Sequence, residues 1–346
     1  MPGHPPLAPG WIDRPHRELD LGDFPLESGE RIRQCRLSYV MHGELDAGRS
    51  NAVLVLSAIG STHHRLDFLI GEGRALDPAR YCILAVDAIG NGLSSSPSNS
   101  ALQPGLAFPR FSMRDMVASQ RRLLDALSIE RLHAVVGASM GGMQALQWGV
   151  SHPRAMRRLV AMTPMARTHR WAQLVNETAR RALSARADWL EPSGAEAAWR
   201  AWVPLMQSLA GRTPLAYSGA AETVEDMVRG LDERVRLQAG GGLAPVDWYF
   251  QSLAYDAHDV GWTPGFRGDT ARALAAVTAR TLLLSPPLDL YNPVESVREA
   301  QLAISRSRHL EIPSRMGHQS TSGAAEEETR FLNDEIGVFL NGSGVA

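Results

Sequence analysis

A serine stands between glycines in the segment VVGASMGGMQ, which covers residues 135–144. Gly137 and Gly141 lie two residues on either side of Ser139, so the segment fits the pattern G-x-S-x-G. Apolar residues of strand type precede the pattern and an apolar helical segment follows it, which is the context of a nucleophile elbow. Because the turn is so tight, the serine takes a strained backbone conformation and only very small neighbours fit. The pattern predicts that Ser139 is a nucleophile, and the alternative is a strand-ending serine that caps a helix.

A serine hydroxyl is a weak nucleophile, so it needs a base and an acid that orients the base. On an elbow of this type the chain order is serine, then Asp or Glu, then histidine. Asp289 follows the apolar run TLLLSPPLD, and His318 follows HLEIP in a late loop, directly after Gly317. The sequence therefore predicts that Asp289 orients His318 and that His318 deprotonates Ser139. Each residue also has a simpler explanation, since Asp289 could cap a helix and His318 could be a solvated loop residue.

Negative charge that develops on a substrate oxygen needs hydrogen-bond donors at the same place. The turn after Ser139 directs the amide of Met140 and the N-terminus of the following helix there. A second amide is expected from the loop in which the apolar run AVLVLSAIG, residues 52–60, comes to its end. We select Ile59 as this donor, with Ala58 and Gly60 as alternatives.

Short apolar runs alternate with helical patterns along the chain, which indicates an α/β fold with a mostly parallel sheet. Between 167 and 270 the texture changes to Ala, Arg, Trp and Met at helical spacing. We therefore expect a sheet domain over 23–166 and 271–346, a helical insertion over 167–270, and an N-terminal arm over 1–22 laid on the surface. Strands are expected at 31–43, 52–60, 81–90, 132–139, 157–164, 280–289 and 308–313, and helices at 111–127, 140–153 and 326–342.

Composition narrows the range of partners. The chain has 346 residues, of which 44% are hydrophobic, and its net charge is −2, so neither nucleic acid nor an anionic membrane is an expected partner. Cys35 and Cys82 cannot make a disulfide framework, which favours a cytoplasmic location. The N-terminus has no apolar stretch typical of a signal peptide, and no run reaches the roughly 18 residues of a membrane span.

Histidines near the expected site have two interpretations, and no metal site is expected. His63 and His64 follow the loop that contains Ile59, so they either line the acyl pocket or are surface residues of a loop. The segment DAHD, residues 256–259, is too compact in sequence to supply a metal site by itself.

Several segments together resemble the homoserine O-acetyltransferase family of α/β-hydrolase-fold enzymes over roughly 30–340. They are GASMGGMQALQW, FSMRDMVASQRRLLDALSIERLHAVVG, GEGRALDPARYCIL and LAYDAHDVG. The resemblance implies a Ser–His–Asp triad at Ser139, His318 and Asp289, and a lid made by the helical insertion. It implies a two-step reaction in which the serine takes an acyl group that a second nucleophile then removes. It also implies no bound cofactor, acetyl-CoA or another acyl-CoA as a possible co-substrate, and a homodimer formed through the lid.

Two positions bear on the acceptor of the acyl group. The transferases of this family follow their catalytic histidine with an aspartate that holds the amino group of homoserine, whereas Gln319 follows His318 here. The family also uses a lid arginine for the homoserine carboxylate, and Arg212 lies near the corresponding place. We expect an acyl-transfer enzyme acting on a short-chain ester or thioester, with water or a small alcohol as acceptor. The alternatives are a homoserine O-acetyltransferase using acetyl-CoA and a non-catalytic small-molecule-binding protein on the same fold.

Overall fold

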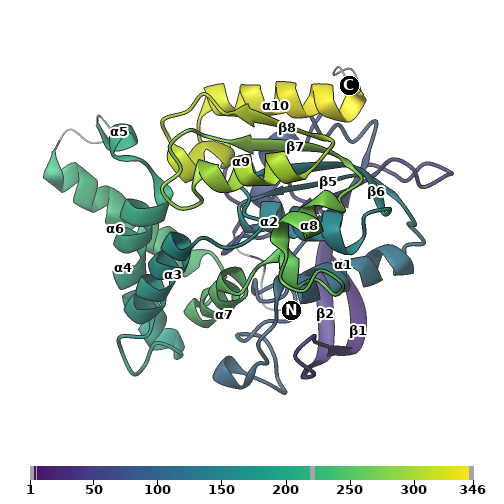
Figure 1. Ribbon diagram of the computed structural model, residues 1–346. Coiled ribbons are helices and arrows are strands. Elements are labelled where there is room, and N and C mark those ends of the chain that lie inside the picture. The colour runs from purple at the N-terminus through teal and green to yellow at the C-terminus, as the bar shows by residue number, and fades with distance from the viewer. Residues whose placement is uncertain (1–3, 5, 219–222, 343–346) are drawn as a thin grey trace.

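A single eight-stranded sheet forms the centre of the molecule (Figure 1), in a computed structural model that describes residues 4, 6–218 and 223–342. The strands lie in the order β1-β2-β4-β3-β5-β6-β7-β8. β1 and β2 pair antiparallel, β2 pairs antiparallel with β4, and all further pairs are parallel. The strands are β1 (Arg17–Pro25), β2 (Arg31–His42), β3 (Ala52–Leu56), β4 (Cys82–Val86), β5 (Leu132–Ala138), β6 (Met156–Met162), β7 (Arg280–Ser285) and β8 (Ser307–Glu311).

Both faces of the parallel strands are covered, which explains their continuous apolar runs. Every residue of β3 and β4 is buried, as expected for strands packed on two sides. One face packs on α1, α2, α8 and α9, and the other packs on η1 and α10. These elements are η1 (His63–Leu69), α1 (Met113–Ala126), α2 (Met140–Ser151), α8 (Thr270–Ala275), α9 (Val294–Ala303) and α10 (Glu326–Asn341).

The ends of two of these helices follow simple local rules. Ser112 begins α1, and its side chain and that of Asp115 each accept a hydrogen bond from the other's backbone, which together form a capping box. Gly342 ends α10 with φ of 78°, a left-handed conformation that glycine adopts without strain.

A group of helices between β6 and β7 stands beside the sheet (Figure 1). Their buried side chains include Trp199 and Trp248, and they share one apolar cluster with Met140 and Met143 of α2. This cluster joins the helices to the sheet next to the N-terminus of α2. The elements are α3 (Arg170–Leu183), α4 (Pro192–Met206), η3 (Gln207–Gly211), α5 (Pro214–Tyr217), α6 (Val224–Gly240) and α7 (Pro245–Asp256), with the short η2 (Gly105–Ala107), η4 (Val260–Trp262) and η5 (Gly317–Thr321) elsewhere.

The N-terminal segment differs from its expected form. Residues 17–22, which the sequence predicts to lie in a surface arm, form most of β1 and pair with residues 35–39 of β2. The pairing is irregular at Asp20 and Gly22, which disturbs the alternation that would have indicated a strand.

The two cysteines are free and buried in the core. Burial raises the pKa of the Cys35 thiol to about 12 and that of Cys82 to about 11. Among the described residues, no helix has the length and apolar character needed to cross a bilayer.

Candidate active site

Ser139 occupies the turn between β5 and α2. Its backbone has φ of 56° and ψ of −123°, a conformation that is strained for a residue with a side chain. The residue is 2% exposed, and it stands at the N-cap position with its hydroxyl making no capping hydrogen bond. The helix-capping alternative is therefore wrong for this side chain, and the hydroxyl is left available for other partners.

Three glycines make this turn possible. A Cβ on Gly137 would lie 2.1 Å from the carbonyl oxygen of Gly141, and a Cβ on Gly141 would lie 2.5 Å from that of Leu56. A Cβ on Gly142 would lie 2.7 Å from the carbonyl oxygen of Met162. These contacts are with backbone atoms, which cannot move aside as the end of a flexible side chain can. The elbow therefore requires glycine at all three positions.

A continuous chain of hydrogen bonds links Ser139, His318 and Asp289. The Nε2 atom of His318 lies 2.8 Å from the Ser139 Oγ, and its Nδ1 atom lies 2.8 Å from the Asp289 Oδ2. The second carboxylate oxygen of Asp289 accepts hydrogen bonds from the backbone N–H groups of Tyr291 and Asn292, at 2.8 and 2.9 Å. These bonds fix the carboxylate so that Oδ2 faces the ring. The ring then donates from Nδ1 and can accept the serine proton at Nε2.

Gly317 allows the loop after β8 to place the histidine. Its φ is 59°, and an added Cβ would lie 2.9 Å from both the Leu288 carbonyl oxygen and the Thr213 Cγ2. The histidine loop therefore packs closely on two other segments, the one before Asp289 and the one at Thr213.

The hydrogen bonds of the loop after β3 show which of its backbone N–H groups is free to act as the second oxyanion donor. The N–H of Ala58 donates to the Ser61 Oγ at 2.8 Å, and that of Gly60 donates to the Gln251 Oε1 at 2.9 Å. Within the described parts of the chain the Ile59 N–H has no hydrogen-bond acceptor. Met140 is the first residue of α2, where helix geometry supplies no acceptor for the backbone N–H. The loop thus leaves Ile59, rather than its neighbours, with a free donor.

Two buried tyrosines lie next to the catalytic candidates, and the sequence patterns did not predict either of them. The ring of Tyr291 meets that of His318 edge to face, with 5.1 Å between centroids. The hydroxyl of Tyr255 donates to the Asn292 Oδ1 at 2.6 Å, and its ring stacks on that of Tyr291 with 5.5 Å between centroids. Burial raises the pKa of both phenols, so they remain neutral donors. Tyr255 lies in the segment LAYDAHDVG, which carried part of the resemblance but gave no hint of this contact.

Gln319 lies in the histidine loop itself, and Arg212 lies on the segment at Thr213 that packs against this loop. Gln319 follows His318 in η5 and is half-buried. Arg212 ends η3, is also half-buried, and has a buried Nε without a hydrogen-bond partner in the described regions. The adjacent Thr213 donates its hydroxyl to the Arg315 carbonyl oxygen at 2.5 Å, which ties this segment to the loop.

His63 and His64 are buried, so the alternative that they are surface residues is wrong. Their exposures are 2% and 4%. The Nδ1 atom of His63 lies 3.1 Å from the Asp87 Oδ2, and that of His64 lies 2.6 Å from the Asp67 Oδ2.

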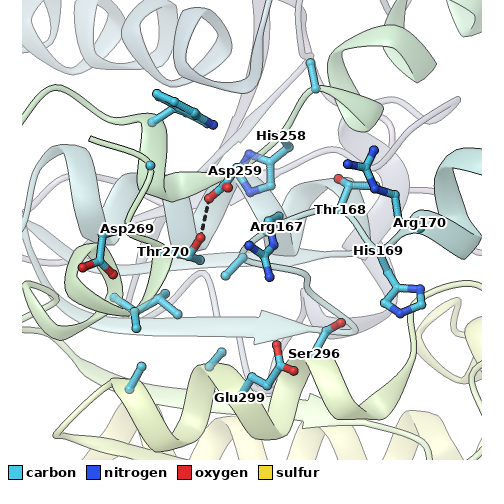
Figure 2. A pocket seen from close by; sticks show the side chains of 18 of the residues that line it. Arg167, Thr168, His169, Arg170, His258, Asp259, Asp269, Thr270, Ser296 and Glu299 are labelled. Carbon is cyan, nitrogen blue, oxygen red and sulfur yellow. Dashed lines mark hydrogen bonds between the residues drawn. The ribbon is translucent and has the colours of Figure 1, made fainter. Parts of the chain in front are cut away.

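A cleft of about 1110 Å³ lies outside the site formed by Ser139, His318 and Asp289 (Figure 2). It is lined by Arg167–Arg170 after β6, by His258 and Asp259, and by side chains of α8 and α9. The Thr270 hydroxyl donates to the Asp259 carboxylate across one wall, at 2.7 Å. Neither Ser139 nor His318 lines this cleft, so its size does not make it the active-site candidate.

The sheet order, the covering helices and the strand–serine–helix turn together define the α/β-hydrolase fold. The family model for the alpha/beta hydrolase fold matches residues 51–192. An ethyl acetate hydrolase from Pseudomonas veronii is 32% identical over 343 residues, covering 94% of this chain and 96% of that protein. A homoserine O-acetyltransferase from Chlorobium chlorochromatii is 28% identical, covering 92% of this chain and 93% of that protein.

Solved structures agree with these sequence comparisons. An acetylester hydrolase from Corynebacterium glutamicum superposes with a TM-score of 0.88 at 27% identity, covering 94% of this chain and 96% of that one. The chain belongs to the homoserine O-acetyltransferase family of α/β-hydrolase-fold enzymes, which includes esterase-like members. This membership fits a serine acyl-transfer or ester-hydrolase role.

Proposed function

We propose that this enzyme hydrolyses short-chain carboxylic esters through an acyl-serine intermediate. The observation that carries the proposal is the 2.8 Å contact between the His318 Nε2 and the Ser139 Oγ, on a ring held by Asp289. A hydroxyl, an imidazole and a carboxylate in this sequence of contacts are the groups of a serine triad.

In the first half of the reaction Ser139 becomes acylated. His318 takes the hydroxyl proton at Nε2 while the Oγ attacks the carbonyl carbon of the ester. The resulting oxyanion accepts hydrogen bonds from the amides of Ile59 and Met140, which supply about 10²–10³ in rate per donor. The tetrahedral intermediate then collapses, the bond to the alcohol oxygen breaks, and that oxygen receives the proton from His318.

In the second half water restores the free enzyme. His318 takes a proton from water as the water oxygen attacks the acyl carbon of acyl-Ser139. Collapse of this second intermediate breaks the bond to the Ser139 Oγ, which recovers its proton from His318, and the carboxylic acid leaves. Asp289 stays ionised and stabilises the imidazolium that forms in each half.

Gln319 supports water or a simple alcohol as the acceptor. A neutral amide cannot pair with an ammonium group as a carboxylate does, so an amino-acid acceptor would lack that charge-assisted contact. The ester hydrolase relative that aligns along nearly the whole chain supports the same preference.

The contacts of α7 support the proposal that the helices within 167–270 form a lid over the site. Gln251 accepts the hydrogen bond from the Gly60 amide at 2.9 Å, and Trp248 packs against Gly60. The lid would therefore contact the loop that contains Ile59. We also propose that the chain forms a homodimer through this lid.

Release of p-nitrophenol from p-nitrophenyl acetate tests the proposal. We expect wild-type turnover, and a loss of at least about 10³-fold in kcat for Ser139→Ala. Ser208→Ala, in the exposed part of the helical insertion, serves as the matched control and should retain full activity. Equal rates for wild type and Ser139→Ala would overturn the proposal. Labelling of Ser139 by a fluorophosphonate separates an enzyme from a non-catalytic binding protein.

The second candidate function is acetyl transfer from acetyl-CoA to homoserine. The buried, unpartnered Nε of Arg212 favours it, because a guanidinium on the segment that contacts the histidine loop could bind the homoserine carboxylate. Acetyl-CoA and homoserine are mixed with the enzyme, and acetate and acetylhomoserine are quantified. Acetylhomoserine formed much faster than acetate would support the transferase, and acetate alone would reject it.

A further inference from the structure

Four histidines from distant parts of the sequence gather beside the loop that follows β3. His4 and His16 come from the segment before β1, and His63 and His64 come from the start of η1. The ring centroids of His63 and His64 are 4.1 Å apart, and the ring of His4 lies 5.5 and 5.0 Å from theirs. His16 lies 4.6 Å from His63 and 4.8 Å from His4. We call these four residues the histidine cluster.

Buried carboxylates hold the two inner rings by one nitrogen each. The Nδ1 of His63 contacts Asp87, and the Nδ1 of His64 contacts Asp67. Asp87 also accepts hydrogen bonds from the side chains of Asn91 and Ser38, at 2.9 Å each. A carboxylate that accepts from Nδ1 leaves the lone pair of the ring on Nε2.

The Nε2 atoms of His4 and His64 face each other. The Nε2 of His64 lies 2.9 Å from the Nε2 of His4. The Nε2 of His63 is buried and has no hydrogen-bond partner in the described part of the chain, on a residue that is 2% exposed. Imidazoles whose other ring nitrogen is held by a carboxylate, as in His63 and His64, are the ligands typical of protein-bound zinc.

We propose that His4, His63 and His64 bind one zinc ion, or a similar divalent transition metal, through their Nε2 atoms. One ligand atom from each lies within 4.8 Å of the others. Zinc–nitrogen bonds of about 2.1 Å in a tetrahedron place ligand atoms about 3.4 Å apart, so modest rotation of the rings closes the site. His16 belongs to a second such group, with His63 and Asp87, so the three proposed ligands leave the fourth position to a water molecule.

A metal here would fasten the N-terminal segment to the body of the molecule. Trp11 already stacks on His64 with 4.2 Å between ring centroids, and the Ile12 N–H donates to Asp67 at 2.8 Å. A ligand that binds the folded form stabilises it in proportion to the logarithm of its concentration over Kd. The metal therefore has a structural role that does not depend on the acyl chemistry proposed for Ser139.

Calorimetric titration of the chelator-treated full chain with ZnCl₂ tests the site. We expect one zinc per chain, a rise in the Tm with zinc, and visible absorption of a tetrahedral site when Co²⁺ replaces zinc. His64→Ala and His4→Ala should each weaken zinc binding by 10-fold or more. His4 lies on the N-terminal segment, so its variant remains informative if His64→Ala fails to fold.

His169→Asn is the matched control, because His169 is exposed and lies outside the histidine cluster. This variant should bind zinc as the wild type does. Absence of stoichiometric binding to the wild type, or equal zinc affinity in the wild type and His4→Ala, would overturn the proposal. In either case the simple hydrogen bond between His4 and His64 would be the whole interaction.

Discussion

The carboxylate of Asp289 has a different partner on each oxygen. Two backbone N–H groups hold Oδ1, which leaves Oδ2 to select the tautomer of His318. The order of serine, acid and histidine in the chain was enough to choose these residues from the sequence. The supporting residues Tyr255 and Tyr291 could not be chosen, because tyrosines at these spacings carry no local signal.

Asp289→Asn tests this division of roles. The two backbone donors will keep the amide oxygen at the Oδ1 position, so the amide NH₂ will face the His318 Nδ1. The ring must then carry its proton on Nε2, where it can no longer accept the serine proton. We expect kcat for p-nitrophenyl acetate to fall by about 10⁴ with little change in KM. Asp188→Asn, at an exposed ion pair with Arg186, should keep wild-type kcat. A wild-type kcat in Asp289→Asn would exclude this role.

At the scale of elements, the elbow depends on the close approach of β3, β5 and α2. The sequence indicated these elements because β3 and β5 are continuous apolar runs and glycines crowd the turn between β5 and α2. β3 and β4 end before the apolar runs at 52–60 and 81–90 do. The runs continue past the strands because the loop residues that follow are also buried. Pattern alone does not separate a buried strand from a buried loop.

Gly141→Ala tests the packing at the elbow. Its Cβ would lie 2.5 Å from the Leu56 carbonyl oxygen, so β3 and α2 must separate. We expect the free energy of unfolding to fall by about 2 kcal/mol or more, measured by urea denaturation. Gly230→Ala is the control, because that glycine lies in α6 and no atom of the described residues lies within 4 Å of the added Cβ. The control should gain roughly 0.5–1 kcal/mol, and equal effects of the two substitutions would contradict the packing argument.

At the scale of the whole molecule, the order of strands and helices was predictable because each element carries its own periodicity. Contacts between distant segments were not predictable in the same way. The joining of His4 and His16 to His63, and the pairing of β1 with β2, depend on where the N-terminal segment returns in space. The same limit applies to Arg212, whose neighbour Thr213 meets the histidine loop only in the folded chain.

Stability of the whole molecule should decrease in acid because of His258. Burial, with a smaller contribution from Arg114, lowers the pKa of this histidine to about 3. The unfolded chain takes up the proton as the pH falls below about 6.5, while the folded chain does not. The neutral ring thus contributes stability above pH 6.5 that is lost toward pH 3, at about 1.4 kcal/mol per pH unit.

Urea denaturation at pH 7 and pH 5 measures this contribution. We expect the wild type to lose about 2 kcal/mol more over this interval than His258→Gln, which carries no titrating group at that position. His169→Asn removes an exposed histidine and should keep the wild-type pH dependence. The same pH dependence in the wild type and His258→Gln would show that the buried ring is not responsible.

The burial of both cysteines has a practical consequence for enzymology. Thiols with pKa values near 12 and 11 carry almost no thiolate at neutral pH, so Ellman's reagent should leave the folded protein unmodified. Free coenzyme A released from a thioester would then be the sole source of yellow colour in the cuvette. A continuous colorimetric assay of thioester cleavage is therefore possible on the native chain without first removing its cysteines.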